Sequence, residues 1–351
     1  MDAIVAAGAV GAMAEVIDGD TAIRVRSGAA ALGSADPVPF DGHFRMGSAT
    51  KPFIAVVVLQ LAAEGRLSLE DPVSKWVPDL VQGNGNDGSR ITIRHLLQHT
   101  SGLFDYFNDY RFISTIFTPE AFEENRLREW TPEALVRLAV SHPPTAEPGA
   151  AWSYTNTGYV LAGMVIEAVT GEPWAVQVRK RIIEPLGLQR TYAPGSDPAI
   201  ARPFARGYEL YGTDGGYVDV TEKNMTMADA SGALITATGD LSRFFAALMR
   251  GELLEPAQLE EMLKAVPIGE GAAYGLGLWF KELPCRPGEG YWSHDGTALG
   301  YETRTGVLPD GSRSFVVSVT TTDALYGSTR FDEAVERSLD ALARHALCGA
   351  R

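Results

Sequence analysis

The chain has 351 residues, of which 45% are hydrophobic and 21% charged, and its formal net charge is −14. This length and composition are typical of a globular protein with a large core, and the negative charge argues against nucleic acid or an anionic membrane as the main partner. No stretch reaches the roughly 18 apolar residues of a membrane-spanning helix, so we expect no transmembrane anchor.

The N-terminal region predicts a β-hairpin followed by a buried helix. Two alternating runs within residues 12–31, AMAEVID and TAIRVRSG, are separated by Gly19-Asp20, which is typical of a hairpin. Residues 51–64 are almost entirely apolar and end before Gly65, so they predict a helix. Pro52 is compatible with this helix because proline is tolerated in a first helical turn.

The middle of the chain, from about 67 to 223, predicts loops alternating with helices. The stretch RITIRHLLQHTSGL predicts a short helix before a turn. The stretch TPEALVRLAV predicts a helix with a threonine N-cap. The stretch NTGYVLAGMVIEAVTG predicts an apolar helix that ends at Gly171. Residues 202–217, which are rich in Gly and Tyr, predict a loop or a short hairpin.

The last third predicts strands and a final helix. YGLGLWFKEL, GYWSHDG, YETRTGVLP and RSFVVSVTTT predict successive strands, and residues 330–345 an amphipathic helix. Strands thus come from both ends of the chain and helices from the middle. We therefore expect an α/β protein of the α+β type, with an antiparallel sheet flanked by helices. It would be one catalytic unit over 1–351, with a sheet lobe of about 1–66 plus 228–351 and a mainly helical lobe of about 67–227.

The first candidate for chemistry is Ser48-Ala49-Thr50-Lys51, the only Ser-x-x-Lys in the chain. The i, i+3 spacing places Ser48 and Lys51 on one face at the start of the apolar helix. A lysine buried there costs several kcal/mol unless it is paired or loses its proton. The helix N-terminus favours a neutral lysine and an anionic oxygen, which suits a nucleophilic serine with a lysine base.

Two further motifs follow in the chain. Tyr154-Thr155-Asn156 precedes an apolar helix, and we prefer it to the second Tyr-x-Asn at Tyr106-Phe107-Asn108 because it repeats the loop-then-core-helix setting of Ser48. His294-Asp295-Gly296 is predicted on a strand of the C-terminal sheet, where Gly296 permits close approach of another backbone. HExxH and CxxC spacings do not occur, and we expect neither a metal nor a cofactor.

These motifs in this order resemble those of the penicillin-recognising serine enzymes. The resemblance is nearest to the secreted D-alanyl-D-alanine carboxypeptidase/transpeptidases with a His-x-Gly motif, and extends to class C β-lactamases, D-aminopeptidases and esterases. It covers about residues 11–348 and includes FRMGSATKPF, LEDPVSKWVPDL, ITIRHLLQHTSGL, PGAAWSYTNTGY, ASGALITATGDLSRFFAALM and YGLGL. It implies the DD-peptidase/β-lactamase fold.

The resemblance also implies catalytic roles for four residues. Ser48 would be the acylated nucleophile and Lys51 its proton acceptor. Tyr154 would pass the proton to the leaving group, and His294 stands where other members carry a lysine.

It further implies substrate-binding roles. Asn156 would hold the amide of the acyl side, and the N–H groups of Ser48 and Thr297 would form the oxyanion hole beside Gly296. An arginine expected after GLGL is replaced by Trp279, and Asp295 would repel a substrate carboxylate if desolvated. Lys281 and Arg304 lie nearby in the sequence, and either cation could bind a substrate carboxylate.

Cys285 and Cys348 are the only cysteines. Residue types alone leave free thiols open, whereas the resemblance implies a Cys285–Cys348 disulfide. A disulfide would indicate a secreted or extracytoplasmic protein. A native start at Met1 would indicate a cytoplasmic protein.

The resemblance leaves three functions open. The preferred one is a monomeric serine hydrolase or acyltransferase of D-alanyl-D-alanine carboxypeptidase type, acting on small D-residue peptides and acylated by β-lactams. The second is an esterase, D-amino-acid amidase or peptide-cyclising thioesterase that uses the same acyl-enzyme. The third is a penicillin-binding receptor with low turnover.

Overall fold

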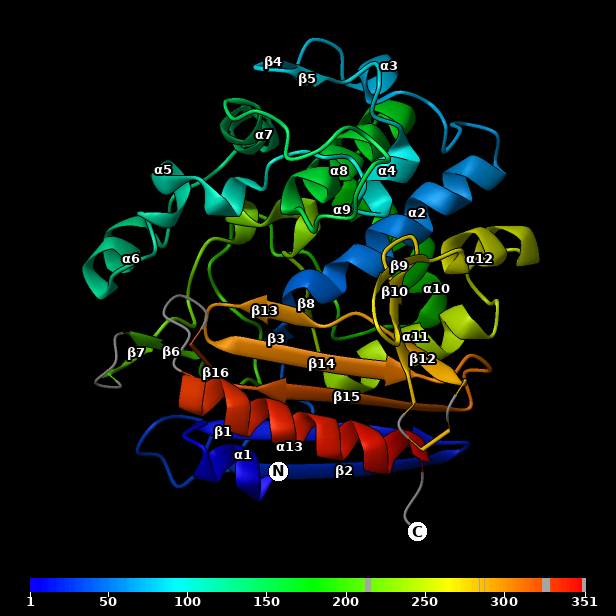
Figure 1. The fold of residues 1–351 in the computed structure, drawn as a ribbon. Coiled ribbons are helices and arrows are strands. Elements are labelled where there is room, and N and C mark those ends of the chain that lie inside the picture. The colour runs from blue at the N-terminus through cyan, green and yellow to red at the C-terminus, as the bar shows by residue number, and fades with distance from the viewer. Residues whose placement is uncertain (212–215, 284, 287, 324–328, 349–351) are drawn as a thin grey trace.

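The computed structural model describes all residues except 212–215, 284, 287, 324–328 and 349–351. Its main element is an antiparallel nine-stranded sheet in the order β2-β1-β15-β14-β12-β11-β10-β9, with β13 paired to β14 (Figure 1). The strands are β1 (Gly11–Asp18), β2 (Thr21–Gly28), β9 (Val266–Gly269), β10 (Ala272–Tyr274), β11 (Trp279–Glu282), β12 (Gly290–Ser293), β13 (Gly296–Ala298), β14 (Tyr301–Val307) and β15 (Arg313–Val319). The expected antiparallel α+β architecture is confirmed.

The two ends of the chain meet in this sheet. β1 pairs with β2, which confirms the predicted hairpin, and its other edge pairs with β15. Along β15 the side chains alternate between faces, because successive residues of a strand point to opposite sides. Phe315 and Val317 pack in the core under the C-terminal helix α13 (Thr329–Cys348), whereas Val316 belongs to the main core on the other face.

The second lobe consists mainly of helices. They are α3 (Val73–Trp76), α4 (Ile93–Leu97), α5 (Tyr110–Ile113), α6 (Pro119–Asn125), α7 (Pro132–Val140), α8 (Asn156–Thr170), α9 (Trp174–Val178) and α10 (Glu184–Leu186), with the 3-10 turn η2 (Tyr106–Asn108). Helix α2 (Lys51–Ala63) runs between this lobe and the sheet (Figure 1), and its side chains are buried along nearly its whole length. An apolar helix without a polar face suits this central position.

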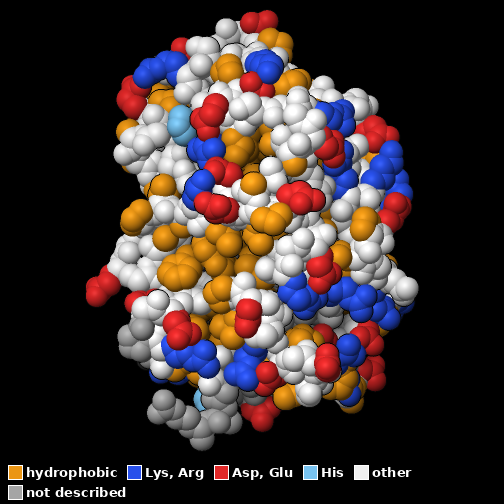
Figure 2. Space-filling view, turned by 90° about the vertical axis from the view of Figure 1, so that its right-hand side faces the viewer, with side chains coloured by type: hydrophobic (Ala, Val, Ile, Leu, Met, Phe, Trp, Pro, Cys, Tyr) orange, Lys and Arg blue, Asp and Glu red, His pale blue; other side chains and the backbone are white. Residues whose placement is uncertain are grey.

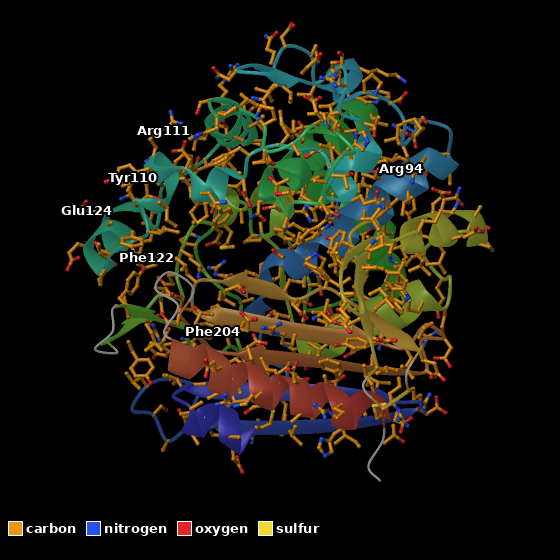
Figure 3. The ribbon with its side chains drawn as sticks, in the orientation of Figure 1. Arg94, Tyr110, Arg111, Phe122, Glu124 and Phe204 are labelled. Atoms are coloured by element: carbon orange, nitrogen blue, oxygen red, sulfur yellow. A yellow bond between two sulfur atoms is a disulfide. The ribbon has the colours of Figure 1, made fainter. Side chains whose placement is uncertain are left out.

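Helices α11 (Thr238–Met249) and α12 (Pro256–Leu263) complete the sheet lobe, and α1 (Asp2–Ala6) packs beside α13. Arg94 of α4 forms ion pairs with Glu70 at 2.6 Å and with Glu261 of α12 at 2.9 Å (Figure 3). This half-buried arginine joins the helical lobe to the sheet lobe. The opposite end of the helical lobe carries Tyr110, whose side chain is 81% exposed (Figure 3).

Two short segments refine the sequence predictions. The region expected to be a loop or hairpin contains strands β6 (Tyr208–Tyr211) and β7 (Gly216–Asp219), which form a small sheet with β16 (Thr321–Thr322), and residues 212–215 of this region lie outside the described part. The expectation that His294 lies on a strand was wrong. β12 ends at Ser293 and β13 begins at Gly296, because side-chain hydrogen bonds replace the regular ladder to β14 between them. The N–H of His294 donates to Thr305 Oγ1, and the N–H of Thr305 donates to Asp295 Oδ1.

On the face shown in Figure 2, acidic and basic side chains are interspersed and hydrophobic side chains gather across the middle. Among the helices that the structure describes, none is both long enough and apolar enough to cross a membrane. Within the same residues, no group of three or more His, Cys, Asp or Glu side chains is placed to hold a metal ion.

A disulfide links Cys285, between β11 and β12, to Cys348 at the end of α13, with 6.2 Å between the Cα atoms. Reduction is expected to lower the free energy of unfolding by up to about 4 kcal/mol, since the bridge closes a loop with a sequence separation of 63. Urea unfolding with and without dithiothreitol measures this difference, and a Cys285→Ser/Cys348→Ser variant should not respond to the reductant. Two free thiols in denatured, unreduced protein would contradict the bridge and favour a cytoplasmic location.

Candidate active site

Ser48 lies in the 3-10 turn η1 (Gly47–Thr50), which leads directly into α2. Gly47 has φ +53°, and a Cβ there would come within 2.5 Å of the carbonyl oxygen of Thr297. A Cβ on Gly296 would come within 2.0 Å of the Met46 carbonyl oxygen and 2.8 Å of the Ser48 nitrogen. Both positions therefore require glycine, because the backbones of η1 and β13 touch. This contact places the N–H groups of Ser48 and Thr297 at the same edge of the site.

Lys51 is completely buried. Its Nζ lies 3.0 Å from Ser48 Oγ, 2.8 Å from Asn156 Oδ1 and 2.8 Å from the carbonyl oxygen of Ser231. Burial lowers the pKa of Lys51 to about 7, although the nearby Asp105 carboxylate raises it. Both the amide oxygen and the carbonyl oxygen can only accept hydrogen bonds. A neutral amine would donate its two hydrogens to them and keep its lone pair for the Ser48 hydroxyl.

Tyr154 is the tyrosine beside Ser48, and its ring centroid lies 4.8 Å from Lys51 Nζ. Burial raises the pKa of Tyr154 well above its usual range, although the Ser48 hydroxyl lowers it. The phenol is therefore protonated near neutral pH and has a proton to donate. Tyr106, of the other Tyr-x-Asn, is fully buried and donates instead to the carbonyl oxygen of Met227 at 2.9 Å.

His294 is also buried, and its hydrogen bonds fix its tautomer. Its Nδ1 lies 2.8 Å from the carbonyl oxygen of Asp295, which can only accept, so Nδ1 carries the hydrogen. Its Nε2 lies 3.0 Å from the hydroxyl of Tyr274. Burial, with a contribution from the charge of Lys51, lowers the pKa of His294 to about 3. The ring is therefore neutral near pH 7, and it does not replace the positive charge of a lysine at this position.

The Asp295 carboxylate forms ion pairs with two cations. Its Oδ2 accepts from Lys281 Nζ at 2.8 Å and from Arg304 at 3.1 Å, and its Oδ1 accepts from the N–H of Thr305 at 3.1 Å. Burial would raise the pKa of Asp295, but the two cations lower it to about 2. Arg304 also lies 3.1 Å from Glu302. The two cations expected near Asp295 are present, and both are already paired.

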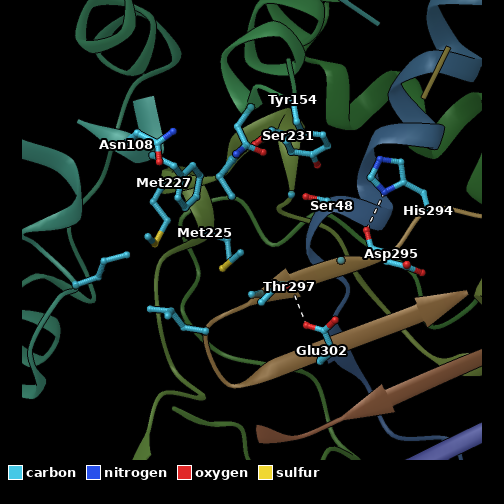
Figure 4. Close-up of a pocket in the computed structure, with 18 of the residues that line it drawn as sticks. Ser48, Asn108, Tyr154, Met225, Met227, Ser231, His294, Asp295, Thr297 and Glu302 are labelled. Carbon is cyan, nitrogen blue, oxygen red and sulfur yellow. Dashed lines mark hydrogen bonds between the residues drawn. The ribbon is translucent and has the colours of Figure 1, made fainter. Parts of the chain in front are cut away.

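A pocket of about 700 Å³ opens beside Ser48 (Figure 4). Ser48, Tyr154, Asn156, His294, Asp295, Gly296, Thr297 and Trp279 all line it, so the structure brings the predicted site residues together. Thr297 lies at its edge, where its hydroxyl donates to Glu302 at 2.7 Å (Figure 4). One wall is apolar and is formed by Phe107, Ile113, Ile116, Met225 and Met227.

Sequence reasoning missed several contributors to the site. Asp105 binds Asn156, the carbonyl oxygen of Ser231 binds Lys51, and Tyr274 binds His294. His99, which is fully buried with φ +59°, has its ring centroid 4.2 Å from that of Tyr154. Of these, Tyr274, His99 and Ser231 fall in stretches that carried the resemblance, YGLGL, ITIRHLLQHTSGL and ASGALITATGDLSRFFAALM, and their position there was the available signal. Asp105 falls in none of these stretches.

The fold and this constellation define a serine-enzyme site of the kind found in penicillin-binding proteins and β-lactamases. The family model described as Beta-lactamase matches residues 1–338, and the chain belongs to this family of serine hydrolases. The resemblance to the penicillin-recognising serine enzymes and the expected fold class are confirmed.

Among solved structures, a D-stereospecific amidohydrolase from Streptomyces sp. is 39% identical, with a TM-score of 0.88 over 99% of this chain and 97% of that chain. The D-amino acid amidase of Ochrobactrum anthropi SV3, in complex with L-phenylalanine amide, is 28% identical, with a TM-score of 0.80 over 97% of this chain and 95% of that chain. The octameric penicillin-binding protein homologue of Pyrococcus abyssi is 25% identical, with a TM-score of 0.75 over 97% of this chain and 75% of that chain. A monomeric state for this chain stays a prediction.

Among curated proteins, penicillin-binding protein 4* of Bacillus subtilis is 29% identical over 81% of this chain and 62% of its own length. Esterase EstB of Burkholderia gladioli is 35% identical over 56% of this chain and 51% of its own length. The matches thus span about half to three fifths of these curated relatives.

Proposed function

We propose that this protein hydrolyses amides or esters of D-configured, apolar acyl groups through an acyl-enzyme on Ser48. The observation that carries the proposal is the set of three contacts around Lys51 Nζ, which suits a neutral amine facing the Ser48 hydroxyl. This is the second of the three functions that the sequence leaves open.

In the proposed reaction, Ser48 Oγ attacks the substrate carbonyl carbon while its proton passes to Lys51 Nζ. The N–H groups of Ser48 and Thr297 stabilise the oxyanion. The amine or alcohol leaves with a proton delivered through Tyr154. Water then attacks the acyl-enzyme, which releases the acid and restores the Ser48 hydroxyl.

The pocket supports the acyl half of this proposal. Its apolar wall offers contacts to a large hydrophobic side chain, since burial of apolar surface contributes about 25 cal/mol per Å². Asn156 Oδ1 already binds Lys51 and its Nδ2 binds Asp105, so only the second hydrogen of Nδ2 could bind a substrate amide. The preference for D-configuration rests on the similarity to the D-stereospecific amidohydrolase and the D-amino acid amidase.

The leaving-group side supports a neutral group. Trp279 stacks on Tyr154 with 6.2 Å between ring centroids, and the neutral His294 carries no positive charge. Lys281 and Arg304 are paired with Asp295. A substrate carboxylate would have to compete with Asp295 for these cations, so the charge repulsion expected from the sequence becomes competition for partners.

We therefore expect D-acyl amides, esters or thioesters to exceed the matching free-carboxylate peptides in kcat/KM by at least about tenfold, equivalent to roughly 1.4 kcal/mol. Asp295→Thr should narrow this difference because it releases Lys281 and Arg304, and Trp279→Arg should narrow it further. Adding Lys281→Met to Asp295→Thr should restore much of the difference. Steady-state kinetics on paired substrates with the same acyl group measure the effect.

The second candidate, a D-alanyl-D-alanine carboxypeptidase, is favoured by the presence of Lys281 and Arg304 near the site. Equal or better rates on the free-carboxylate peptide would show that one of them binds the carboxylate despite Asp295. The deciding experiment combines penicillin labelling, detected by intact mass, with turnover of D-phenylalanine amide, its L-enantiomer, a D-Ala-D-Ala peptide and a D-acyl thioester. Adduct formation without turnover of any substrate would favour the receptor alternative.

A further inference from the structure

Asp105 is a half-buried carboxylate just outside the pocket, at the N-cap of η2. Its Oδ1 accepts from the N–H of Phe107 at 3.1 Å. Its Oδ2 accepts from the backbone N–H of Asn156 at 3.2 Å and from Asn156 Nδ2 at 3.0 Å. Burial raises the pKa of Asp105 above its usual range, although these N–H donors and the charge of Lys51 lower it in part. All three hydrogen-bonding groups are donors, so the contacts suit the ionised carboxylate, which only accepts.

This carboxylate decides which way the Asn156 side chain faces. A carboxamide has nearly the same shape in its two orientations, and its neighbours determine where the oxygen and the nitrogen lie. Because an ionised carboxylate cannot donate, Nδ2 must face Asp105. Oδ1 must then face Lys51, from which it lies 2.8 Å away. In the opposite orientation, Nδ2 would present a hydrogen to Nζ and compete with the Ser48 hydroxyl for its lone pair.

We propose that Asp105 is a positioning residue that holds Asn156 with its oxygen toward Lys51 and thereby directs the Nζ lone pair at the Ser48 hydroxyl. This role of Asp105 rests on the proposed function, in which Lys51 is the base that accepts the Ser48 proton. The carbonyl oxygen of Ser231, 2.8 Å from Nζ, takes the other hydrogen of the amine. Asp105 does not line the pocket, so it acts through Asn156 and Lys51 rather than on the substrate.

Asp105 also acts on Lys51 through its charge. A carboxylate near an amine favours the protonated form, so loss of the Asp105 charge should lower the pKa of Lys51 further. The other titratable groups around Lys51 carry no charge near neutral pH, because burial lowers the pKa of both histidines and raises the pKa of both tyrosines. These groups are His99, His294, Tyr154 and Tyr159.

The test compares Asp105→Asn and Asp105→Ala with Asp109→Asn as a matched control. Asp109 is another buried carboxylate of the helical lobe, but its partners are Arg111 and His142. The acylation rate of each protein with p-nitrophenyl acetate is measured against pH, and intact mass of a peptide digest locates the acetyl group. Thermal denaturation identifies variants that fail to fold.

For Asp105→Asn, we expect the acid limb of the acylation profile to move to lower pH by about one unit, the lower end of the effect of an opposite charge a few ångströms away. For Asp105→Ala, we expect a loss of about 10² in the maximal rate, the lower end of what a general base contributes. Asp109→Asn should leave the acid limb unchanged even if it destabilises the fold.

Three outcomes separate the proposals. Absence of an acetyl group on Ser48 in the unmodified protein would overturn the proposed function itself. An acetylated Ser48 with an unchanged acid limb in Asp105→Asn would overturn only the role of Asp105. Equal limb shifts in Asp105→Asn and Asp109→Asn would also overturn it, because the effect would then come from the lobe as a whole.

Discussion

Replacement of Ser48 by alanine is expected to abolish turnover and covalent labelling by a β-lactam or an activated ester, with a loss in kcat on the order of 10⁵–10⁶. Without Oγ no acyl-enzyme can form, and the Ser48 and Thr297 N–H groups alone provide only residual catalysis. The fold should survive, because Lys51, which bonds to this hydroxyl, keeps its contacts to Asn156 and to the carbonyl oxygen of Ser231. Product formation and intact mass measure the two effects, and thermal denaturation checks the fold.

Ser231 offers a matched control for this experiment. It is another serine that lines the pocket, but its Oγ donates to the carbonyl oxygen of Ala228 at 2.5 Å. Lys51 binds the backbone oxygen of Ser231, which Ser231→Ala retains. That variant should therefore keep labelling and most activity. An acyl adduct on the Ser48→Ala variant, or loss of labelling in the Ser231→Ala variant alone, would contradict the assignment of Ser48 as the nucleophile.

The sequence was sufficient to predict those parts of the fold that depend on local patterns. The hairpin of β1 and β2, the apolar helix α2 and the helix α8 that ends at Gly171 all follow from side-chain periodicity and from glycine positions. The path of residues 294–295 does not follow from periodicity. Side-chain hydrogen bonds to Thr305 interrupt the regular ladder there, and the next residue, Gly296, packs against the backbone of η1. That packing contact joins segments about 250 residues apart.

The electrostatics of the site were predictable only in part. The buried setting of Lys51 follows from its place in an apolar helix. The compensation of Asp295 by Lys281 and Arg304 depends on the register of β11, β12, β13 and β14, which brings residues 281, 295 and 304 together. The role of Asp105 depends on a hydrogen bond between residues 51 positions apart. Motif spacing predicts which residues react but not which partners set their charge and orientation.

Lys51→Ala is expected to lower the acylation rate by several decades, since general-base catalysis contributes about 10²–10⁴ and part of the local electrostatic field is lost with it. The variant also leaves Asn156 Oδ1 and the Ser231 carbonyl oxygen without their donor. The acyl-enzyme should still be detectable after long incubation, because Ser48 and the oxyanion N–H groups remain. A rate within tenfold of the unmodified protein would exclude Lys51 as the base.

The pH profile provides the independent check on Lys51. A lysine base acts when deprotonated, so kcat/KM should be constant above the pKa of about 7 and fall about tenfold per pH unit below it. Burial lowers the pKa of His294 to about 3, and it also lowers the pKa of His99 well below its usual range. Neither histidine would then produce an acid limb near pH 7. A neutral ester is the suitable substrate, because its own charge does not change over this range. Persistence of a limb near pH 7 in the residual activity of Lys51→Ala would show that a different group titrates, and the base would then have to be sought elsewhere in the pocket.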